Sequence, residues 1–411
     1  MPPRVVILNE NESVPFDTRV WQECQALRSD GWEVHVICPT GHFEDPELET
    51  EVEGVRLHRF PLRAATGGPV GYLREYALAL FHLLRLAWRL GPVDVVHASN
   101  PPDLMFLVAK LLKRRGAWFV FDHHDLVPEL YLSRFDRGQD ALYRATRWLE
   151  RKTFEAADVA IATNESYREI AVDRGGMDPG RVFVVRNAPA DQRVRTVTPD
   201  PALAEGKQHL LCYLGTMGPQ DGVDYAVRAL RTLREVHGRE DWHAAFIGAG
   251  DCLDELKQLA ADLGLESMVT FTGRVSNEDL CRYLSTADIC LAPDPRNALN
   301  DVSSMTKIVE YMTVGKPIVS FDLRETRFTA QEAAVYAEPN SERDFAKLIV
   351  NLLDDPSERS RMGKVGQARA LGELSWDRSR EALLSAYKIL RAPRPVTASR
   401  WRGKGRPAPT V

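Results

Sequence analysis

The chain has 411 residues, of which 44% are hydrophobic and 27% are charged, which is ordinary for a globular protein of two or three domains. Its 53 basic and 58 acidic side chains give a formal net charge of −5, which argues against a nucleic-acid-binding protein because such proteins carry a basic excess. The six cysteines form no Cys-x-x-Cys pair, so zinc-ligand spacing is absent and buried thiols in a reducing compartment are favoured.

Short apolar runs alternate with helical patterns through the first half of the chain. Strands are predicted over Arg4–Leu8, Glu33–Cys38, Val55–Pro61, Val93–His97, Trp118–Phe121, Asp158–Ala162 and Val182–Val185. Helices are predicted over Arg19–Ser29, Asp103–Arg115 and Asp140–Ala156. Continuous runs of valine, isoleucine and leucine separated by helices are typical of a parallel sheet that is covered on both faces.

The alternation stops over residues 187–208, a proline-containing stretch with little apolar periodicity, and then starts again. Strands are predicted over His209–Leu214, His243–Ile247, Val269–Thr272, Ile289–Ala292 and Pro317–Ser320. Helices are predicted over Val223–His237, Cys252–Leu263, Asn277–Leu284, Met305–Thr313 and Glu342–Leu353. The fold class is therefore α/β, with two Rossmann-like doubly wound domains facing each other across a cleft.

These patterns divide the chain into five segments. We expect an N-terminal domain over residues 1–188, a linker over 189–208 and a C-terminal domain over 209–374. A last amphipathic helix is predicted over 375–390. Residues 391–411 contain four prolines, six basic side chains and no acidic one, so this tail is predicted to be disordered.

Two apolar segments bear on membranes. The run Val5–Leu8 is too short for the core of a signal peptide, so we expect a cytoplasmic protein. The segment Tyr72–Leu90 has helical apolar spacing but contains too many charges to span a bilayer. Its basic residues, and those of the next predicted helix, are Arg74, Arg85, Arg89, Lys110, Lys113, Arg114 and Arg115. This pattern fits either contact with the inner, anionic face of a membrane or an ordinary helix packed on the sheet with its arginines in solvent.

Loops that follow strands of the second domain carry groups suited to a diphosphate. Gly215 and Thr216 follow one strand and Gly248 follows the next, although tight turns alone also explain such glycines. Farther on, Ser304, Met305 and Thr306 open a helix on which Lys307 and Glu310 share a face. A lysine at a helix start suits phosphate and a carboxylate one turn later suits ribose hydroxyls, whereas a surface Lys–Glu pair is the alternative.

In the first domain, Asp122, His123, His124 and Asp125 follow a predicted strand. Histidines flanked by aspartates can serve as hydrogen-bonding or acid–base groups. They could also bind a metal, but the sequence offers no further cluster of ligands. A structural histidine bonded to a loop carbonyl is the third interpretation.

Taken in order, these segments resemble the GT-B glycosyltransferases of family 4 over about residues 4–390. The resemblance rests on PFDTRVWQECQALRSDGWEVHVICP, VDVVHASNPPD, FDHHDLVPE, AADVAIATNESYREI, VFVVRNAP, YLGTM, FIGAGDCLDEL, VTFTGRV, ADICLAP and SMTKIVEYMTVGKPIVSFDLRETR. It implies a retaining enzyme that needs no metal or tightly bound cofactor and uses a nucleotide-diphosphate sugar. It also implies that the last helix returns to the N-terminal domain.

The resemblance assigns roles to particular positions. His124 corresponds to a histidine beside the transferred sugar, and Glu310 to a glutamate that contacts the nucleotide ribose. Lys307 resembles a lysine of the branch that makes cell-surface polysaccharides, and we expect it to act in catalysis with those two residues. Donor-binding positions are Gly215, Thr216, Gly248, Arg274, Val275, Asp301, Ser304, Met305 and Thr306. Acceptor-side positions are Asp17, Arg19 and Asn100.

Two departures from the family pattern concern the donor site. The first glutamate of the Glu-x7-Glu motif is replaced by Val302, for which the adjacent Asp301 is the expected substitute. The family's Arg and Lys after the first donor-domain strand are absent, and Lys307 is the cation expected to replace them.

The predicted function is transfer of a sugar from a UDP-sugar, with GDP as the second candidate, to a glycan, lipid-linked or small-molecule acceptor. The leaving diphosphate is expected to take the acceptor proton. A sugar-nucleotide epimerase of the same fold and a non-catalytic nucleotide-sugar-binding subunit are the alternatives. A dehydrogenase is disfavoured because no complete Gly-x-Gly-x-x-Gly with a distal acid is present.

Overall fold

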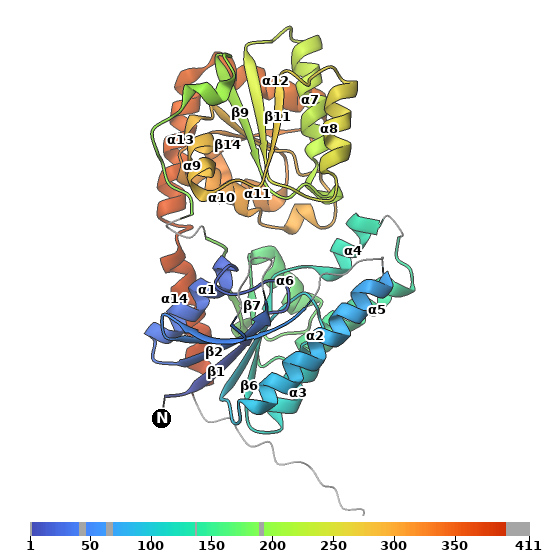
Figure 1. Cartoon of the computed structure of the whole chain (residues 1–411), viewed down its shortest axis with the longest axis vertical. Coiled ribbons are helices and arrows are strands. Elements are labelled where there is room, and N and C mark those ends of the chain that lie inside the picture. The colour runs from blue at the N-terminus through green and yellow to red at the C-terminus, as the bar shows by residue number, and fades with distance from the viewer. Residues whose placement is uncertain (1, 41–46, 63–68, 136–137, 189–192, 392–411) are drawn as a thin grey trace, which may run out of the picture.

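The computed structural model describes residues 2–40, 47–62, 69–135, 138–188 and 193–391, and it contains two α/β units stacked end to end (Figure 1). Residues 392–411, which make up nearly all of the predicted tail, lie outside the described residues, as do linker residues 189–192. Each unit is a twisted sheet covered by helices on both faces, as the apolar runs predict.

The first unit contains eight strands in the order β3-β4-β2-β1-β5-β6-β7-β8. Their bounds are β1 (Arg4–Leu8), β2 (Glu33–Pro39), β3 (Glu49–Val52), β4 (Val55–Phe60), β5 (Val95–Ser99), β6 (Trp118–His123), β7 (Val159–Ala162) and β8 (Val182–Val184). All neighbours pair in parallel except β3 and β4, which form an antiparallel hairpin. The prediction missed β3 because this edge strand, with sequence ETEV, has no apolar run.

Alternation along the strands divides the core of the first unit into two faces. Val5 and Ile7 of β1 point toward one hydrophobic cluster and Val6 and Leu8 toward another, as period-two side chains must. The first face is covered by α1 (Thr18–Ser29) and α14 (Trp376–Leu390), and the second by α2 (Pro69–Arg89), α3 (Phe106–Lys113), α5 (Ala141–Ala156) and α6 (Glu165–Asp173). The short helix α4 (Val127–Phe135) follows β6 and packs on α5.

The second unit contains six parallel strands in the order β11-β10-β9-β12-β13-β14. Their bounds are β9 (His209–Leu214), β10 (Trp242–Ile247), β11 (Val269–Gly273), β12 (Ile289–Ala292), β13 (Ile318–Phe321) and β14 (Ala334–Ala337). The helices are α7 (Val223–Glu235), α8 (Leu253–Asp262), α9 (Asn277–Thr286), α10 (Thr306–Thr313), α11 (Arg324–Ala330), α12 (Glu342–Asp354) and α13 (Pro356–Leu371). Of these elements, β14, α11 and α13 are additional to the predicted ones.

Two connections tie the units together. Within the stretch predicted as a linker, residues from 193 onward pack on the second unit, since the amides of Val197 and Asp200 donate to side chains of α9. After the second unit, α14 crosses back and lies beside α1 in the first unit (Figure 1). There Ser379 of α14 donates to the main-chain oxygen of Arg186, 2.9 Å away. Among the described helices, none has the length and apolar character required to cross a bilayer.

Candidate active site

The carboxyl ends of both sheets meet where the two units touch. Asn164, just after β7, caps α6 and donates to the oxygen of Val302 (2.9 Å) and to the hydroxyl of Ser304 (3.1 Å). The hydroxyl of Tyr167 lies 3.0 Å from that of Ser303. In open α/β sheets ligands bind beyond this edge, so the boundary between the two units is the candidate site.

The contacts of Val302 explain why the first glutamate of the family motif is absent at this position. Val302 packs against the hydrophobic core of the first unit together with Leu299, so this segment of the second unit is anchored by apolar contact. Asp301, its expected substitute, is directed elsewhere, because its carboxylate accepts from the amide of Arg324 at the start of α11 (3.1 Å) and lies 3.4 Å from Arg296.

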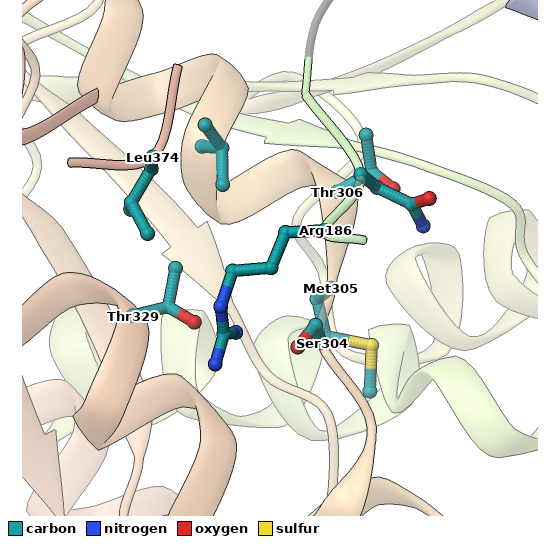
Figure 2. A pocket seen from close by; sticks show the side chains of 8 residues that line it. Arg186, Ser304, Met305, Thr306, Thr329 and Leu374 are labelled. Carbon is teal, nitrogen blue, oxygen red and sulfur yellow. The ribbon is translucent and has the colours of Figure 1, made fainter. Parts of the chain in front are cut away.

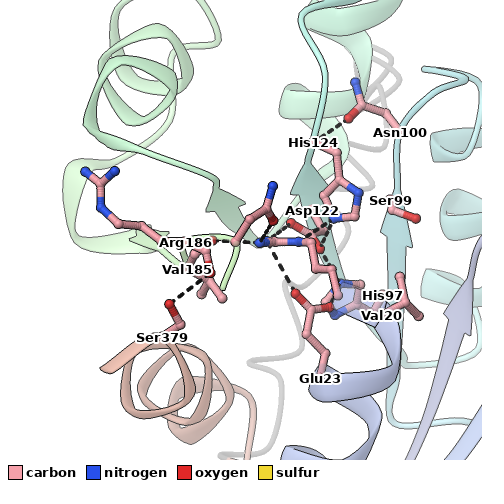
Figure 3. Close-up of polar contacts among 12 residues, drawn as sticks. Val20, Glu23, His97, Ser99, Asn100, Asp122, His124, Val185, Arg186 and Ser379 are labelled. Carbon is pink, nitrogen blue, oxygen red and sulfur yellow. Dashed lines mark hydrogen bonds and ion pairs between the residues drawn. The ribbon is translucent and has the colours of Figure 1, made fainter. Parts of the chain in front are cut away.

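Near the end of β6, the side chains of Arg19, Glu23, Asp122 and His124 contact one another, and we call them the arginine cluster. Figure 3 labels the last three of them. Arg19 donates from Nη2 to Asp122 Oδ1 (2.9 Å), and its Nε lies 2.8 Å from His124 Nε2. Asp122 Oδ2 lies 2.5 Å from the same His124 nitrogen. Glu23 reaches the cluster from α1, 3.3 Å from Arg19.

The two acids of the arginine cluster have opposite pKa shifts. Burial raises the pKa of Glu23 well above its usual value, and the neighbouring charge of Asp122 adds to this. Burial also acts against ionisation of Asp122, but the charge of Arg19 and the bonds from His124 outweigh it and hold the pKa of Asp122 well below its usual value. These opposite shifts favour an ionised Asp122 beside the Arg19 cation and a protonated Glu23.

The same geometry bears on metal binding. Glu23, Asp122 and His124 offer ligand atoms within 4.8 Å of one another, and the sequence pattern missed Glu23 because it lies on a distant helix. The Arg19 guanidinium already supplies positive charge among these atoms. His123 points the other way and is fully buried among aromatic rings, 3.7 Å from Glu150, so the paired histidines do not act together.

The residues predicted to face an acceptor lie behind His124. Asn100 is buried, and its Oδ1 accepts from the amides of His124 (2.7 Å) and Asp125 (3.1 Å). Asp17 caps α1 by accepting from the amide of Val20. Arg19, with 9% of its surface exposed, also bonds to the oxygen of Val185 and to Asn187. Asn100 and Arg19 therefore contact His124 or its loop, whereas Asp17 caps α1, and all three side chains are engaged within the protein.

In the second unit, Lys307 lies among Tyr213, Asp221 and Asp294, which together we call the lysine cluster. Its Nζ is 2.7 Å from Asp294 Oδ1, 3.5 Å from the Tyr213 hydroxyl and 4.8 Å from the centre of that ring. Burial alone would lower the pKa of Lys307, but Asp294, Tyr213 and Asp221 outweigh it and raise it. Lys307 is thus a buried, partnered cation, which rules out the alternative of a surface Lys–Glu pair.

Two further groups flank the lysine cluster. Burial raises the pKa of Asp221 to about 6, although Lys307 partly opposes the shift. Glu310 is buried one turn after Lys307 and lies 3.2 Å from Nε of Arg193. Burial raises the pKa of Glu310, and Arg193 opposes this rise. Sequence reasoning missed Arg193 and Asp294 because neither lies in a motif with Lys307.

The glycines after β9 and β10 are required for close backbone approach. A Cβ on Gly248 would lie 1.9 Å from the oxygen of Gly215, and the amide of Met217 donates to the oxygen of Ala249 (3.2 Å). Two loops therefore pack directly on each other, which explains the glycines without a ligand. Thr216 is exposed beside them; after β11, Arg274 is exposed and Val275 packs partly on the core.

A small pocket opens between the units at the start of α10 (Figure 2). It is lined by Arg186, Asn187, Ser304, Met305, Thr306, Val309, Thr329 and Leu374. The Arg186 guanidinium lies 4.5 Å from the ring centre of Phe328 and 3.8 Å from Glu325, and burial lowers its pKa. The predicted positions Ser304, Met305 and Thr306 thus line a boundary between the units.

The comparisons with known proteins agree with this architecture. A family model described as "Glycosyl transferase 4-like domain" matches residues 17–188, and one described as "Glycosyl transferases group 1" matches residues 208–355. The D-inositol 3-phosphate glycosyltransferase of Kineococcus radiotolerans is 27% identical over 399 residues, which is 88% of this chain and 87% of that protein. The GDP-mannose-dependent alpha-(1-6)-phosphatidylinositol monomannoside mannosyltransferase of Mycobacterium tuberculosis is 29% identical over 335 residues, 79% of this chain and 81% of that protein.

A solved structure has the same fold. Anabaena HepE in complex with UDP and glucose superposes with a TM-score of 0.71 at 14% identity, covering 94% of this chain and all of that one. At this identity the likeness concerns the two-unit architecture alone.

Proposed function

This chain belongs to the GT-B glycosyltransferases, and we propose that it is a retaining, family 4 enzyme that moves a sugar from a UDP-sugar to a glycan, lipid-linked or small-molecule acceptor. The observation that carries the proposal is the buried Lys307 at the start of α10, next to Glu310. The helix α4, which begins three residues after His124, contacts the 3-10 turn Pro219–Asp221 beside Lys307. Binding of UDP and glucose by HepE supports the choice of base.

The proposed mechanism assigns one task to each group. Breaking the bond between the sugar and the diphosphate leaves negative charge on the diphosphate, which Lys307 and the amides at the start of α10 would stabilise. To do so, Lys307 must weaken its bond to Asp294. Glu310 would accept from ribose hydroxyls in place of Arg193, and His124 would hold the sugar. The diphosphate would take the acceptor proton, so no carboxylate pair is needed.

A thermal-shift series tests the donor assignment. Because a ligand that binds only the native state stabilises it by about 2.7 kcal/mol at 100 times its Kd, UDP should raise the Tm and GDP should raise it less. A larger shift with GDP would transfer the proposal to the base used by the M. tuberculosis relative. The absence of a shift with any nucleoside diphosphate would overturn it. Turnover that needs an acceptor then separates a transferase from an epimerase and from a non-catalytic subunit.

We further propose that the acceptor is reached at an anionic membrane surface through α2, α3 and α5, which lie side by side in the first unit (Figure 1). Ordinary packing on the core accounts for one face of α2, where Ala79, Leu83 and Ala87 are buried and Leu80, Leu84, Leu86 and Leu90 are partly buried beside them. Other large apolar side chains of these helices are exposed: Leu78, Phe81, Trp88, Leu107, Leu142 and Trp148. Leu73, which belongs to the sequence pattern, lies outside the described side chains.

Charge on the same helices favours an anionic lipid surface. Exposed cations beside these apolar groups are Arg74, Arg85, Arg89, Lys110, Arg114 and Arg115, and the Arg115 guanidinium lies 4.2 Å from the ring centre of Trp88. Lys113 does not contribute, because it is paired with Asp158 (2.9 Å). Flotation with phosphatidylserine vesicles should decrease with salt and with Arg85 and Arg89 changed to Glu. If the protein does not float with these vesicles at low salt, the membrane proposal is wrong and a soluble acceptor is favoured.

A further inference from the structure

A chain of buried polar side chains leads from the C-terminal helix to His124. The hydroxyl of Tyr387 on α14 lies 2.8 Å from His97 Nδ1 on β5. His97 Nε2 lies 3.3 Å from Asp122 Oδ2, and that oxygen lies 2.5 Å from His124 Nε2. Tyr387, His97 and Asp122 are all at most 1% exposed, so water does not compete for these bonds. The chain thus joins a helix that follows the second unit to the loop of the first unit that carries His124.

The direction of each hydrogen bond follows from the charge of Asp122. Since Arg19 keeps Asp122 ionised, its carboxylate can only accept, and His97 must carry its proton on Nε2. Neutral His97 then has a lone pair on Nδ1, so the Tyr387 hydroxyl donates to it. Burial raises the pKa of Tyr387 well above its usual value, which keeps this donor protonated. The chain therefore runs Tyr387 to His97 to Asp122.

His124 lies at the end of this series of hydrogen bonds, and its Nε2 atom has two possible partners. Its Nε2 either donates to Asp122 or accepts from Arg19 Nε, and a neutral imidazole nitrogen cannot do both. The contact with the anionic oxygen is the shorter one, at 2.5 Å against 2.8 Å, and a carboxylate can only accept. The bonds of Arg19 to Val185 and Asn187 come from Nη1, so they hold the guanidinium in place independently of His124. Donation to Asp122 is therefore favoured, which leaves Nδ1 as the atom available to a ligand.

We propose that Tyr387 is a positioning residue that, through His97 and Asp122, holds His124 with its proton on Nε2 and the lone pair of Nδ1 directed to the sugar. The catalytic importance of this arrangement depends on the proposed function, whereas the tautomer itself does not. Without the tyrosine hydroxyl, His97 Nδ1 has no donor, so the hydrogen bond that holds the imidazole in one tautomer is lost. The donation from His97 Nε2 to Asp122 is then no longer fixed, so Asp122 holds His124 less firmly. Glu23, 3.5 Å from His97, Arg19 and Cys24 are further ionisable groups around these hydrogen bonds.

The test compares Tyr387→Phe with Ser379→Ala in the full chain. Both variants remove one hydrogen bond between α14 and the first unit. Only Tyr387→Phe interrupts the hydrogen bonds that run through His97 and Asp122 to His124. Long-range ¹⁵N–¹H spectra of the histidines report tautomer and titration without any need for activity. We expect Tyr387→Phe to move the ring signals of both His97 and His124, to lower kcat about tenfold with little change in KM, and to displace its pH profile. Ser379→Ala should do none of these.

A second variant guards against misfolding of the first. His97→Gln keeps an N–H donor for Asp122 that does not depend on the tyrosine, so Tyr387→Phe should have no further effect on kcat in that background. Additive losses in this double-mutant cycle, or histidine spectra of Tyr387→Phe that match those of Ser379→Ala, would overturn the proposal. If wild-type protein transfers no sugar while its histidine spectra behave as expected, the proposed function fails and the positioning role stands.

Discussion

The arginine cluster and the lysine cluster each bury one cation among acids, yet they hold it differently. Arg19 donates to a carboxylate, an amide side chain and a main-chain oxygen, so its planar group is fixed from several sides. Lys307 has one short bond, to Asp294, and a looser contact with the Tyr213 hydroxyl.

This difference follows from the chemistry of the two side chains. A guanidinium is a rigid fork of donors, whereas an ammonium is a point charge on a flexible stem that can turn to a new partner. The first unit therefore contains a fixed support behind His124. The second contains a charge that a diphosphate can redirect.

The largest effect is expected from removing the fixed cation, Arg19. Arg19→Met should lower the free energy of unfolding by about 3–5 kcal/mol, because Asp122 is left as an uncompensated buried charge. Urea denaturation measures the loss. Arg151→Met, which removes an exposed partner of Glu155, is the control and should change stability little. Equal effects of the two variants would contradict a structural role for Arg19.

The redirectable cation should matter most for turnover. Lys307→Ala should lower kcat by about 10²–10³, the usual effect of losing one stabiliser of transition-state charge. Asp294→Asn keeps Lys307 but removes the negative charge that binds its ammonium group. The lysine is then freer to contact a diphosphate, so UDP should bind more tightly to this variant, as calorimetry can measure. If both substitutions weaken UDP binding to the same extent, the Lys307–Asp294 pair is purely structural and Lys307 does not turn to the diphosphate.

A substitution in the first unit should affect sugar transfer, whereas one in the second unit should affect nucleotide binding. His124→Ala is expected to lower turnover about 10²-fold and to leave UDP affinity nearly unchanged, because His124 belongs to the first unit. Glu310→Gln should instead weaken UDP binding about tenfold through lost hydrogen bonds to the ribose. Fluorescence titration and initial rates measured on both variants decide this. A matched loss of affinity in the two would show that His124 contacts the nucleotide.

The smallest effect concerns the pH dependence of the lysine cluster. Because burial raises the pKa of Asp221 to about 6, the folded state favours its protonated form, and its ionisation costs stability as pH rises through that value. A protonated Asp221 also repels a diphosphate less. The ratio of UDP affinity in wild type to that in Asp221→Asn should therefore rise as pH falls from 7.5 to 5.5. The ratio removes the titration of UDP itself, and a constant ratio would exclude Asp221 from the donor site.

The pattern of apolar runs was sufficient to predict most of the fold. Buried parallel strands must be apolar on both faces, so runs such as Val159–Ala162 stand out without any partner in view. The polar edge strand β3 and the α13 helix over Pro356–Leu371 were missed because neither carries a strong period, since β3 is partly solvated and α13 has glycines where it packs. Motif positions likewise identified His124, Lys307 and Glu310 as candidates.

Only the tertiary structure decided what those candidates contact. Asp294 lies 13 residues before Lys307 in the loop after β12, and Glu23 reaches Asp122 from a distant helix, so no local spacing could pair them. Sequence by itself determined which segments are apolar enough to be buried and which loops carry charge. Whether a charge is fixed, redirectable or protonated depends on burial and on neighbours at 3 Å, and those are set by how the two sheets, α14 and the connecting loops pack together.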